Sequence, residues 1–315
     1  MNRITKCIAL LVLGVALASC GKSGQSLSSV SGGNVNPATP EAQTQVVQQV
    51  VLNPQLSSES LVRSGNTTSA SMAPVGVDGL VPPPPPWRRH ITSVTDSTLS
   101  KTFSDPDSVG NPTMAHVIIQ KTFRGTLDQF VRTRTGQDSL RLSKPLEDHW
   151  VRKLDLRRVR VWVDSLGVTH TKWHIVGTSG VNVTSSDAAT LITSIRLQGV
   201  GLDTTVTDPL AMVRMRKMVA LPDSVHITVT VNSNNADVFL YRGMMRRRIT
   251  SNGDGTYSAD LRLGLFEWGI EHFAVDALSF GTLHDDAAPY SSNAWVLPFG
   301  HGDRDRDVEG NDDHR

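Results

Sequence analysis

A strict alternation of apolar and polar residues over Ser224–Asn232 is the feature that most limits the folds open to this chain. Valine or isoleucine occupies every second position, with histidine or threonine between them, in the order SVHITVTVN. Because successive side chains of a strand point to opposite faces, this pattern predicts a β-strand with one buried face. Asn-Gly and Asp-Gly dipeptides at 252–255 are strong hairpin signals further on. The region from Trp87 to Phe299 is therefore expected to be all-β.

We expect this region to form two mainly antiparallel parts. Residues 87–205 contain alternating segments, such as 116–124, 169–176 and 191–200, which predict a β-rich, meander-like domain in which one helix near 185–194 is possible. Residues 206–300 contain about seven short predicted strands separated by turn residues, which is typical of a small β-sandwich.

The second part carries a further resemblance. The stretch GDGTYSADL at 253–261 is followed by GIEHFAVDAL at 269–278. A glycine turn with a tyrosine, and then a strand with alternate aromatic and small residues, resembles the end of the immunoglobulin-like domains of bacterial surface proteins. The resemblance implies an immunoglobulin-like β-sandwich over 206–300, although the disulfide-and-tryptophan signature of antibody domains is absent.

The segment 148–164 changes its alternation. Apolar residues occupy even positions up to Leu156 and odd positions from Val159 onward. An offset of one residue moves side chains to the other face of a sheet. The segment is therefore expected to be one long strand with a β-bulge, or two strands meeting near Arg157.

Several arginines lie in this segment, namely Arg152, Arg157, Arg158 and Arg160. We interpret them as a solvated strand face, whose charges also oppose edge-to-edge aggregation. A patch that binds an anionic ligand is the alternative.

The N-terminal residues predict export. Two positive charges, Arg3 and Lys6, precede an apolar run that ends near Ala18 and is too short for the ~20 residues of a transmembrane helix. The sequence LASC at 17–20 then resembles the lipobox of bacterial lipoproteins. This resemblance implies that residues 1–19 are a signal peptide and that the lipidated Cys20 attaches the chain to a membrane. Gly21, in place of aspartate, implies the outer membrane of a two-membrane host.

The cysteines fit this expectation. Cys7 and Cys20 are the only two in the chain. If the first is removed with the signal peptide and the second is lipidated, the mature chain has no disulfide and no free thiol. Cysteine catalysis and cysteine-bound zinc are then excluded.

The composition of residues 20–86 predicts a disordered tether. Serine, glycine, asparagine, glutamine, threonine and proline dominate it, and such a segment buries too little apolar surface to fold. Residues 45–52 are an isolated apolar exception, which reads as a short helix or strand, although we favour disorder there. The tether ends in the prolines 82–86, which favour a stiff spacer. The charged tail 301–315 is also expected to be disordered.

A search for chemistry yields no catalytic, cofactor-binding or metal-ligating residues. Gly177–Gly180 and Asp254 are interpreted as turn residues, and His284-Asp285-Asp286 as a loop. The alternate aspartates of the tail, Asp303, Asp305 and Asp307, lack the glycine and glutamate of a calcium-binding EF-hand loop. Lysine and arginine number 31 against 30 aspartates and glutamates, so we expect no nucleic-acid partner.

The sequence therefore predicts a non-enzymatic, lipid-anchored protein of the bacterial cell envelope. Its β domains would act as a spacer, a scaffold or a binding module for an unknown envelope protein or glycan. An envelope hydrolase, or a carbohydrate-binding accessory protein, is the alternative, and exposed aromatic residues would favour it. A structural subunit of an envelope complex is a third hypothesis, and a large apolar surface patch would favour that one.

Overall fold

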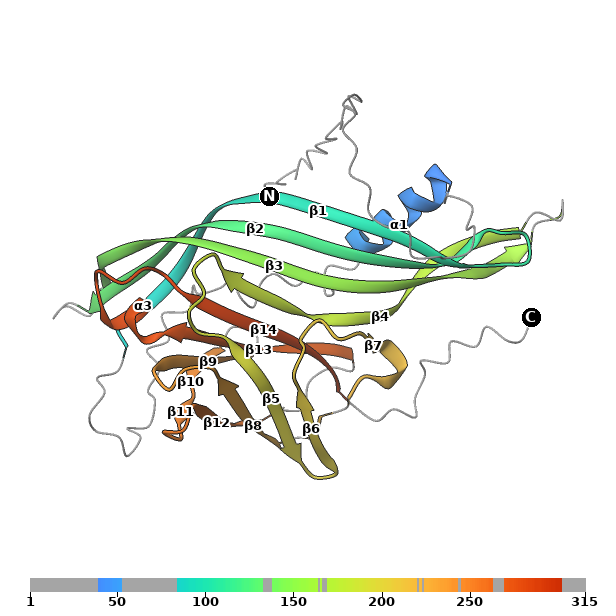
Figure 1. The fold of residues 1–315 in the computed structure, drawn as a ribbon. Coiled ribbons are helices and arrows are strands. Elements are labelled where there is room, and N and C mark those ends of the chain that lie inside the picture. Colours follow the sequence, from blue (N-terminus) through green and yellow to red (C-terminus); the bar gives the residue numbers. More distant parts are fainter. Residues whose placement is uncertain are drawn as a thin grey trace, which may run out of the picture. The chain divides into compact units, whose positions relative to one another are not determined.

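The computed structural model describes residues 39–52, 84–132, 138–163, 165, 169–219, 221–222, 224–242, 245–262 and 269–301. Its strands are β1 (Trp87–Pro106), β2 (Pro112–Arg132), β3 (Asp138–Val163), β4 (Thr169–Ser185), β5 (Ile192–Gly199), β6 (Leu202–Val206), β7 (Val213–Arg214), β8 (Ser224–Val231), β9 (Ala236–Arg242), β10 (Met245–Arg248), β11 (Thr250–Ser251), β12 (Thr256–Arg262), β13 (Gly269–Ser279) and β14 (Ser292–His301). The helices are α1 (Pro40–Leu52), a short 3₁₀ segment (Met215–Lys217) and α3 (Phe280–His284). The prediction of an all-β, mainly antiparallel fold is confirmed (Figure 1).

The described strands form two sheets. A nine-stranded sheet has the order β1-β2-β3-β4-β14-β13-β9-β10, with β7 paired to β4. A five-stranded sheet has the order β11-β12-β8-β5-β6. Neighbouring strands pair in the antiparallel sense throughout both orders. The four longest strands, β1–β4, lie side by side and form one half of the larger sheet (Figure 1).

Strand β3 is one continuous strand. Its even-numbered side chains from Lys144 to Leu156 are all buried, as alternation along a single strand face requires. Its pairing with β4 is irregular between Arg152 and Leu154, and again further along the strand. The expected long strand with a β-bulge is therefore confirmed, and the two-strand alternative is wrong.

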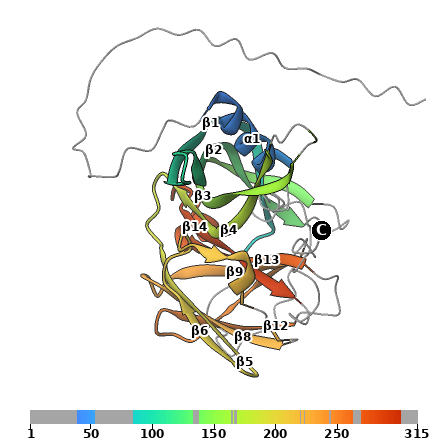
Figure 2. The ribbon, with the colours of Figure 1, turned by 90° about the vertical axis from the view of Figure 1, so that its right-hand side faces the viewer.

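Strands β9, β13 and β14 are buried on both faces and separate two cores. In β13, Phe273, Val275 and Ala277 pack against the five-stranded sheet, in what we call the sandwich core. The alternate residues Ala274 and Leu278 pack on the opposite side with the inward residues of β1–β4, in what we call the curled-sheet core. Figure 2 shows the resulting layers, with β5, β6, β8 and β12 on one side of β13 and with β1–β3 on the other.

The large sheet curls until its two ends meet. Although β1 and β10 lie at opposite ends of the strand order, Trp87 of β1 contacts Phe239 of β9, with the ring centroids 5.3 Å apart. Arg246 of β10 donates from Nη2 to the Trp87 carbonyl oxygen at 2.9 Å. Its guanidinium also lies 3.9 Å from the centroid of the Trp87 ring. The curled-sheet core is thus enclosed at the start of β1.

The structure divides the chain differently from the expected boundary between 87–205 and 206–300. Strand β5 precedes that boundary in sequence but pairs with β8 in the five-stranded sheet. Strand β14 lies near the end of the described chain but pairs with β4 in the large sheet. The two cores share β9, β13 and β14, so they are not two consecutive domains. In addition, residues 185–194 contain no helix: β4 ends at Ser185 and β5 begins at Ile192.

Helix α1 occupies part of the segment expected to be a disordered tether. Thr39 precedes it as the N-cap, since its Oγ1 accepts a hydrogen bond from the Ala42 amide at 3.2 Å. Ala42, Val46 and Val50 share one face, and both valines are buried in the curled-sheet core. The expectation of disorder is therefore wrong at 40–52. Packing against the large sheet supplies the buried surface that the segment lacks when it is taken alone.

We predict that Val46→Asp releases α1 from the sheet, because it places a charge where the side chain is fully buried. Hydrogen exchange measured by mass spectrometry should show faster exchange over 40–52, while β2, β8 and β13 keep their protection. Val51→Asp is the matched control, since Val51 is 70% exposed and should tolerate the charge. Equal exchange in the two variants would contradict the packing of α1.

Candidate functional site

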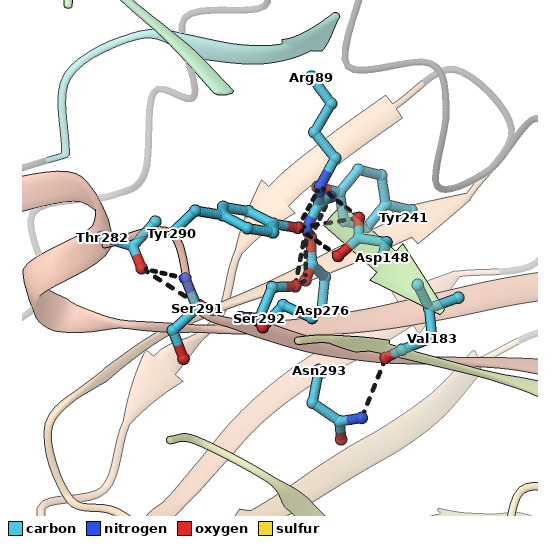
Figure 3. A network of polar contacts seen from close by, with 11 residues as sticks. Arg89, Asp148, Val183, Tyr241, Asp276, Thr282, Tyr290, Ser291, Ser292 and Asn293 are labelled. Carbon is cyan, nitrogen blue, oxygen red and sulfur yellow. Dashed lines mark hydrogen bonds and ion pairs between the residues drawn. The ribbon is translucent and has the colours of Figure 1, made fainter. Parts of the chain in front are cut away.

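Polar side chains from five parts of the chain meet inside the curled-sheet core. We call this group the Arg89 cluster; it consists of Arg89 (β1), Asp148 (β3), Tyr241 (β9), Asp276 (β13), Tyr290 (just before β14) and Ser292 (β14) (Figure 3). Strand alternation places Arg89, Asp148 and Asp276 there, because each occupies an inward position between apolar neighbours, as Asp276 does between Ala274 and Leu278.

Arg89 forms the centre of the cluster. Its Nη1 and Nη2 donate to the two carboxylate oxygens of Asp276 at 2.7 and 3.1 Å, which is a bidentate pair. Its Nε donates to the Tyr290 hydroxyl at 2.9 Å, and that hydroxyl donates in turn to the Asp148 carboxylate at 3.0 Å. Tyr241 donates to Asp276 from the other side at 3.1 Å. One cation therefore connects two carboxylates: Asp276 by a bidentate pair, and Asp148 through Tyr290 and a longer ion pair of 3.7 Å.

The cluster holds two carboxyl groups against one guanidinium. Burial raises the pKa of Asp148 to about 6, although Arg89 opposes this shift. Burial alone would lower the pKa of Arg89, but Asp276, Tyr290, Tyr241 and Asp148 together outweigh it, and the pKa lies well above its ordinary value. Burial also raises the pKa of Tyr241 and Tyr290, so both remain hydroxyl donors at neutral pH. The charge of the cluster thus depends on the protonation of Asp148.

The cluster is closed to solvent, since no member is more than 5% exposed. Its hydrogen bonds run from β1 to β13 and, through Tyr290, to β3. This arrangement is suited to holding the curled sheet together, and it leaves a substrate no exposed group to contact. The sequence reading missed the cluster because Arg88-Arg89 follows the proline run and shows no pattern that separates an inward arginine from an outward one.

The predicted arginine face is only partly correct. Arg157 and Arg160 are exposed, and Arg158 forms an ion pair with Asp107 at 2.5 Å. Arg152, in contrast, is fully buried, so its assignment to a solvated face is wrong. The physical reason is the unbroken alternation of β3, which keeps every even position inward as far as Leu156. Arg152 therefore belongs to the curled-sheet core rather than to a surface patch.

Residues 284–286 do not converge on one point. His284 Nε2 lies 2.9 Å from Oδ2 of the buried Asp237, which also pairs with Arg248. Asp286 instead pairs with Arg141 at 2.6 Å. Asp285 accepts a hydrogen bond from the Ala287 amide. These three side chains hold the chain around α3 rather than forming one set of ligands.

The two predicted turns have different outcomes. Asp254 accepts hydrogen bonds from the Thr256 amide and hydroxyl at 2.9 and 2.6 Å, as expected of a turn residue. Gly177–Gly180 lies within β4, so the prediction of a turn is wrong there. Its Ser179 hydroxyl accepts from the Lys153 amide and donates to the Gly180 carbonyl, which bridges the irregular pairing with β3.

Other sequence predictions fall outside the described residues. These are the lipid-attachment residue Cys20 and the tail aspartates Asp303, Asp305 and Asp307. Within the described ranges, no group of three or more histidine, cysteine, aspartate or glutamate side chains is arranged to hold a metal ion.

Comparison with known proteins gives this chain no relative: no family model, curated protein or solved structure matches it.

We predict that Asp148 makes the folded wild-type chain more stable as the pH falls, and that Asp148→Asn abolishes this contribution. Native Asp148 has a pKa of about 6, whereas an unfolded aspartate has a pKa of about 3.9. The native state therefore binds this proton more tightly, and its stability increases as the pH falls from 7 toward 4, by about 3 kcal/mol in all. Urea unfolding across this range measures the difference between wild type and variant. If the free energy of unfolding changes with pH by the same amount in both proteins, the prediction is wrong.

Loss of Arg89 should be costly. Arg89→Met leaves Asp276 buried without its cation, which is expected to lower the free energy of unfolding by about 3–5 kcal/mol. Arg88→Met is the matched control, because Arg88 is exposed and its ion pair with Asp128 is long, at 3.7 Å. That change should cost less than about 1 kcal/mol. Urea unfolding at neutral pH compares the two, and similar losses would show that the cluster does not hold the sheet.

Proposed function

We propose that this chain is a lipid-anchored protein of the bacterial cell envelope, in which the β fold serves as a spacer, scaffold or binding module and catalyses no reaction. The sequence LASC at 17–20, placed after a charged and then an apolar segment, is the observation that carries the proposal. Its resemblance to a lipobox assigns the lipid to Cys20, and Gly21 favours the outer membrane. An immunoglobulin-like sandwich remains part of this proposal.

The structure is compatible with a peripheral attachment. No helix in the described ranges is both long and apolar enough to cross a membrane. The Arg89 cluster is committed to internal contacts. The outer loops of the sheets are available to a macromolecular partner, and such loops are where binding modules on rigid scaffolds make contact.

Helix α1 adds a geometric element to the proposal. About 20 residues separate Cys20 from the start of α1, and they span at most about 70 Å when fully extended. Without α1, about 67 residues would separate Cys20 from β1, with a limit of about 230 Å. Packing of α1 against the large sheet therefore reduces the chain between Cys20 and the packed part of the fold from about 67 residues to about 20.

The exposed apolar residues bear on the alternative of a carbohydrate-binding protein. Among the described residues, the large apolar side chains that are exposed are all aliphatic. The three tyrosines are buried, as are Trp87, Trp150, Trp173 and Trp295. Stacking on sugar rings uses exposed aromatic side chains, so this observation gives the carbohydrate-binding alternative no support. The side chains of Trp162 and Trp268 lie outside the described residues.

Membrane fractionation and protease shaving test the proposal. We predict that the wild-type chain sediments with outer membranes, whereas Cys20→Ser is released into the soluble fraction. Shaving of intact cells, followed by blotting for residues 269–301, then shows whether the domain faces the surface or the periplasm. Retention of Cys20→Ser in the membrane would overturn the lipid-anchor proposal.

A further inference from the structure

Arg152 is a buried cation without a buried anion. Its side chain is fully buried at an inward position of β3, in the curled-sheet core. Burial lowers its pKa to about 10, so it still carries a positive charge at neutral pH. Within the part of the chain that the structure describes, no carboxylate forms an ion pair with it, and its Nη1 has no hydrogen-bond partner.

The contacts that Arg152 does make are with neutral groups. Its Nε and Nη2 donate to the Thr178 hydroxyl oxygen at 3.2 and 2.9 Å. Nη2 also lies 3.5 Å from Nε2 of His272. Burial, and then the neighbouring Arg152, lower the pKa of His272 to about 3, so the imidazole is neutral and adds no negative charge.

A comparison with Arg89 shows that the described surroundings of Arg152 lack a carboxylate. Arg89 is equally deep in the same core, but there Asp276 neutralises it through a bidentate pair. A buried charge without such a partner costs several kcal/mol in typical proteins. Asp148 is on the inward face of β3 as well, but its carboxylate is engaged by Tyr290 and Arg89. Among the described residues, Arg152 therefore lacks a negatively charged partner.

The groups beside Arg152 favour an oxyanion. Trp150, the preceding inward residue of β3, is buried, and its indole N–H has no hydrogen-bond partner. The ammonium of Lys121 lies 5.5 Å from the centroid of the Trp150 ring. Unpaired donors next to positive charge are complementary to a group that only accepts hydrogen bonds, such as a carboxylate or a phosphate.

We propose that Arg152, with Trp150 and Thr178 beside it, forms a binding site for a ligand that presents one carboxylate or phosphate group to the interior of the curled sheet. Ile119 of β2 and Val181 of β4 are the cross-strand neighbours of Arg152 and are buried, so the sheet on either side of Arg152 is apolar. His272, which contacts Arg152, is only partly buried. The anion comes from a small free ion or from the end of an apolar chain, as in a fatty acid.

Titration calorimetry at constant ionic strength tests the site with three probes: acetate, inorganic phosphate and laurate. The full chain is used with Cys20→Ser in every sample, so that no attached acyl chain competes and the result is independent of the lipid-anchor proposal. We expect saturable binding of at least one probe. Laurate alone would indicate a fatty-acid-like ligand, whereas acetate or phosphate would indicate a small oxyanion.

Variants of Arg152 make the test specific. Arg152→Met should abolish binding, and Arg152→Lys should weaken it roughly 10- to 100-fold, since it keeps the charge but loses the planar fork. Arg157→Met, an exposed arginine of the same strand, should bind like the parent chain. Should Arg152→Met fail to fold by circular dichroism, the lysine variant decides the question. Absence of binding to all three probes, or equal binding by the Arg152 variants, would overturn the site.

Discussion

The pairing of Arg89 with Asp276 is the interaction on which the curled sheet depends. Arg89 lies at one end of the strand order, and Asp276 lies in β13, near the other end. Every pairing between neighbouring strands could persist in a flatter sheet, because backbone hydrogen bonds do not fix how far a sheet curls. The contacts at the start of β1, which also include the Trp87 stack on Phe239, close the core at that point. Since both charges are buried, water does not compensate either charge when its partner is removed.

Two arginines in one core illustrate how burial and charge separate structural from ligand-directed residues. Arg89 has its carboxylate within the chain, so its role is complete in the folded protein. Arg152 has a hydroxyl and a neutral imidazole instead, and one of its nitrogens is unpaired. The same side chain at the same depth therefore points to two different functions. A ligand at Arg152 would make the inside of the sheet, and not only its outer surface, a part of the domain that binds.

The sequence predicted the regular strands well and the irregular ones poorly. Strand β8 was evident because its apolar residues alternate without interruption, and β3 because its even positions do so as far as Leu156. Strand β1 was missed because most of its residues are polar and exposed, and because its pairing with β2 shifts twice, near Ser93 and Thr98. Such shifts break the alternation that identifies a strand and also protect an exposed edge.

The polar sites could not be predicted for a different reason. Alternation tells which positions face inward, but Arg89 and Arg152 interrupt apolar patterns in the way that exposed residues do. Their partners are distant in sequence, as Asp276 is from Arg89, so no local spacing identifies them. Helix α1 was likewise missed, because the surface that buries Val46 and Val50 comes from strands far along the chain. Tertiary packing decides these cases, and a single sequence does not display it.

A double-mutant cycle between Arg89→Met and Asp276→Asn tests the central claim most directly. The free energies of unfolding are measured for the wild type, the two single variants and the double variant at neutral pH. The account predicts that the double variant loses far less stability than the sum of the single losses, with a coupling energy above about 2 kcal/mol, because each single change leaves a buried group without its partner. Additive losses, within about 0.5 kcal/mol, would show that the two residues act independently and that the curl of the sheet rests on other contacts.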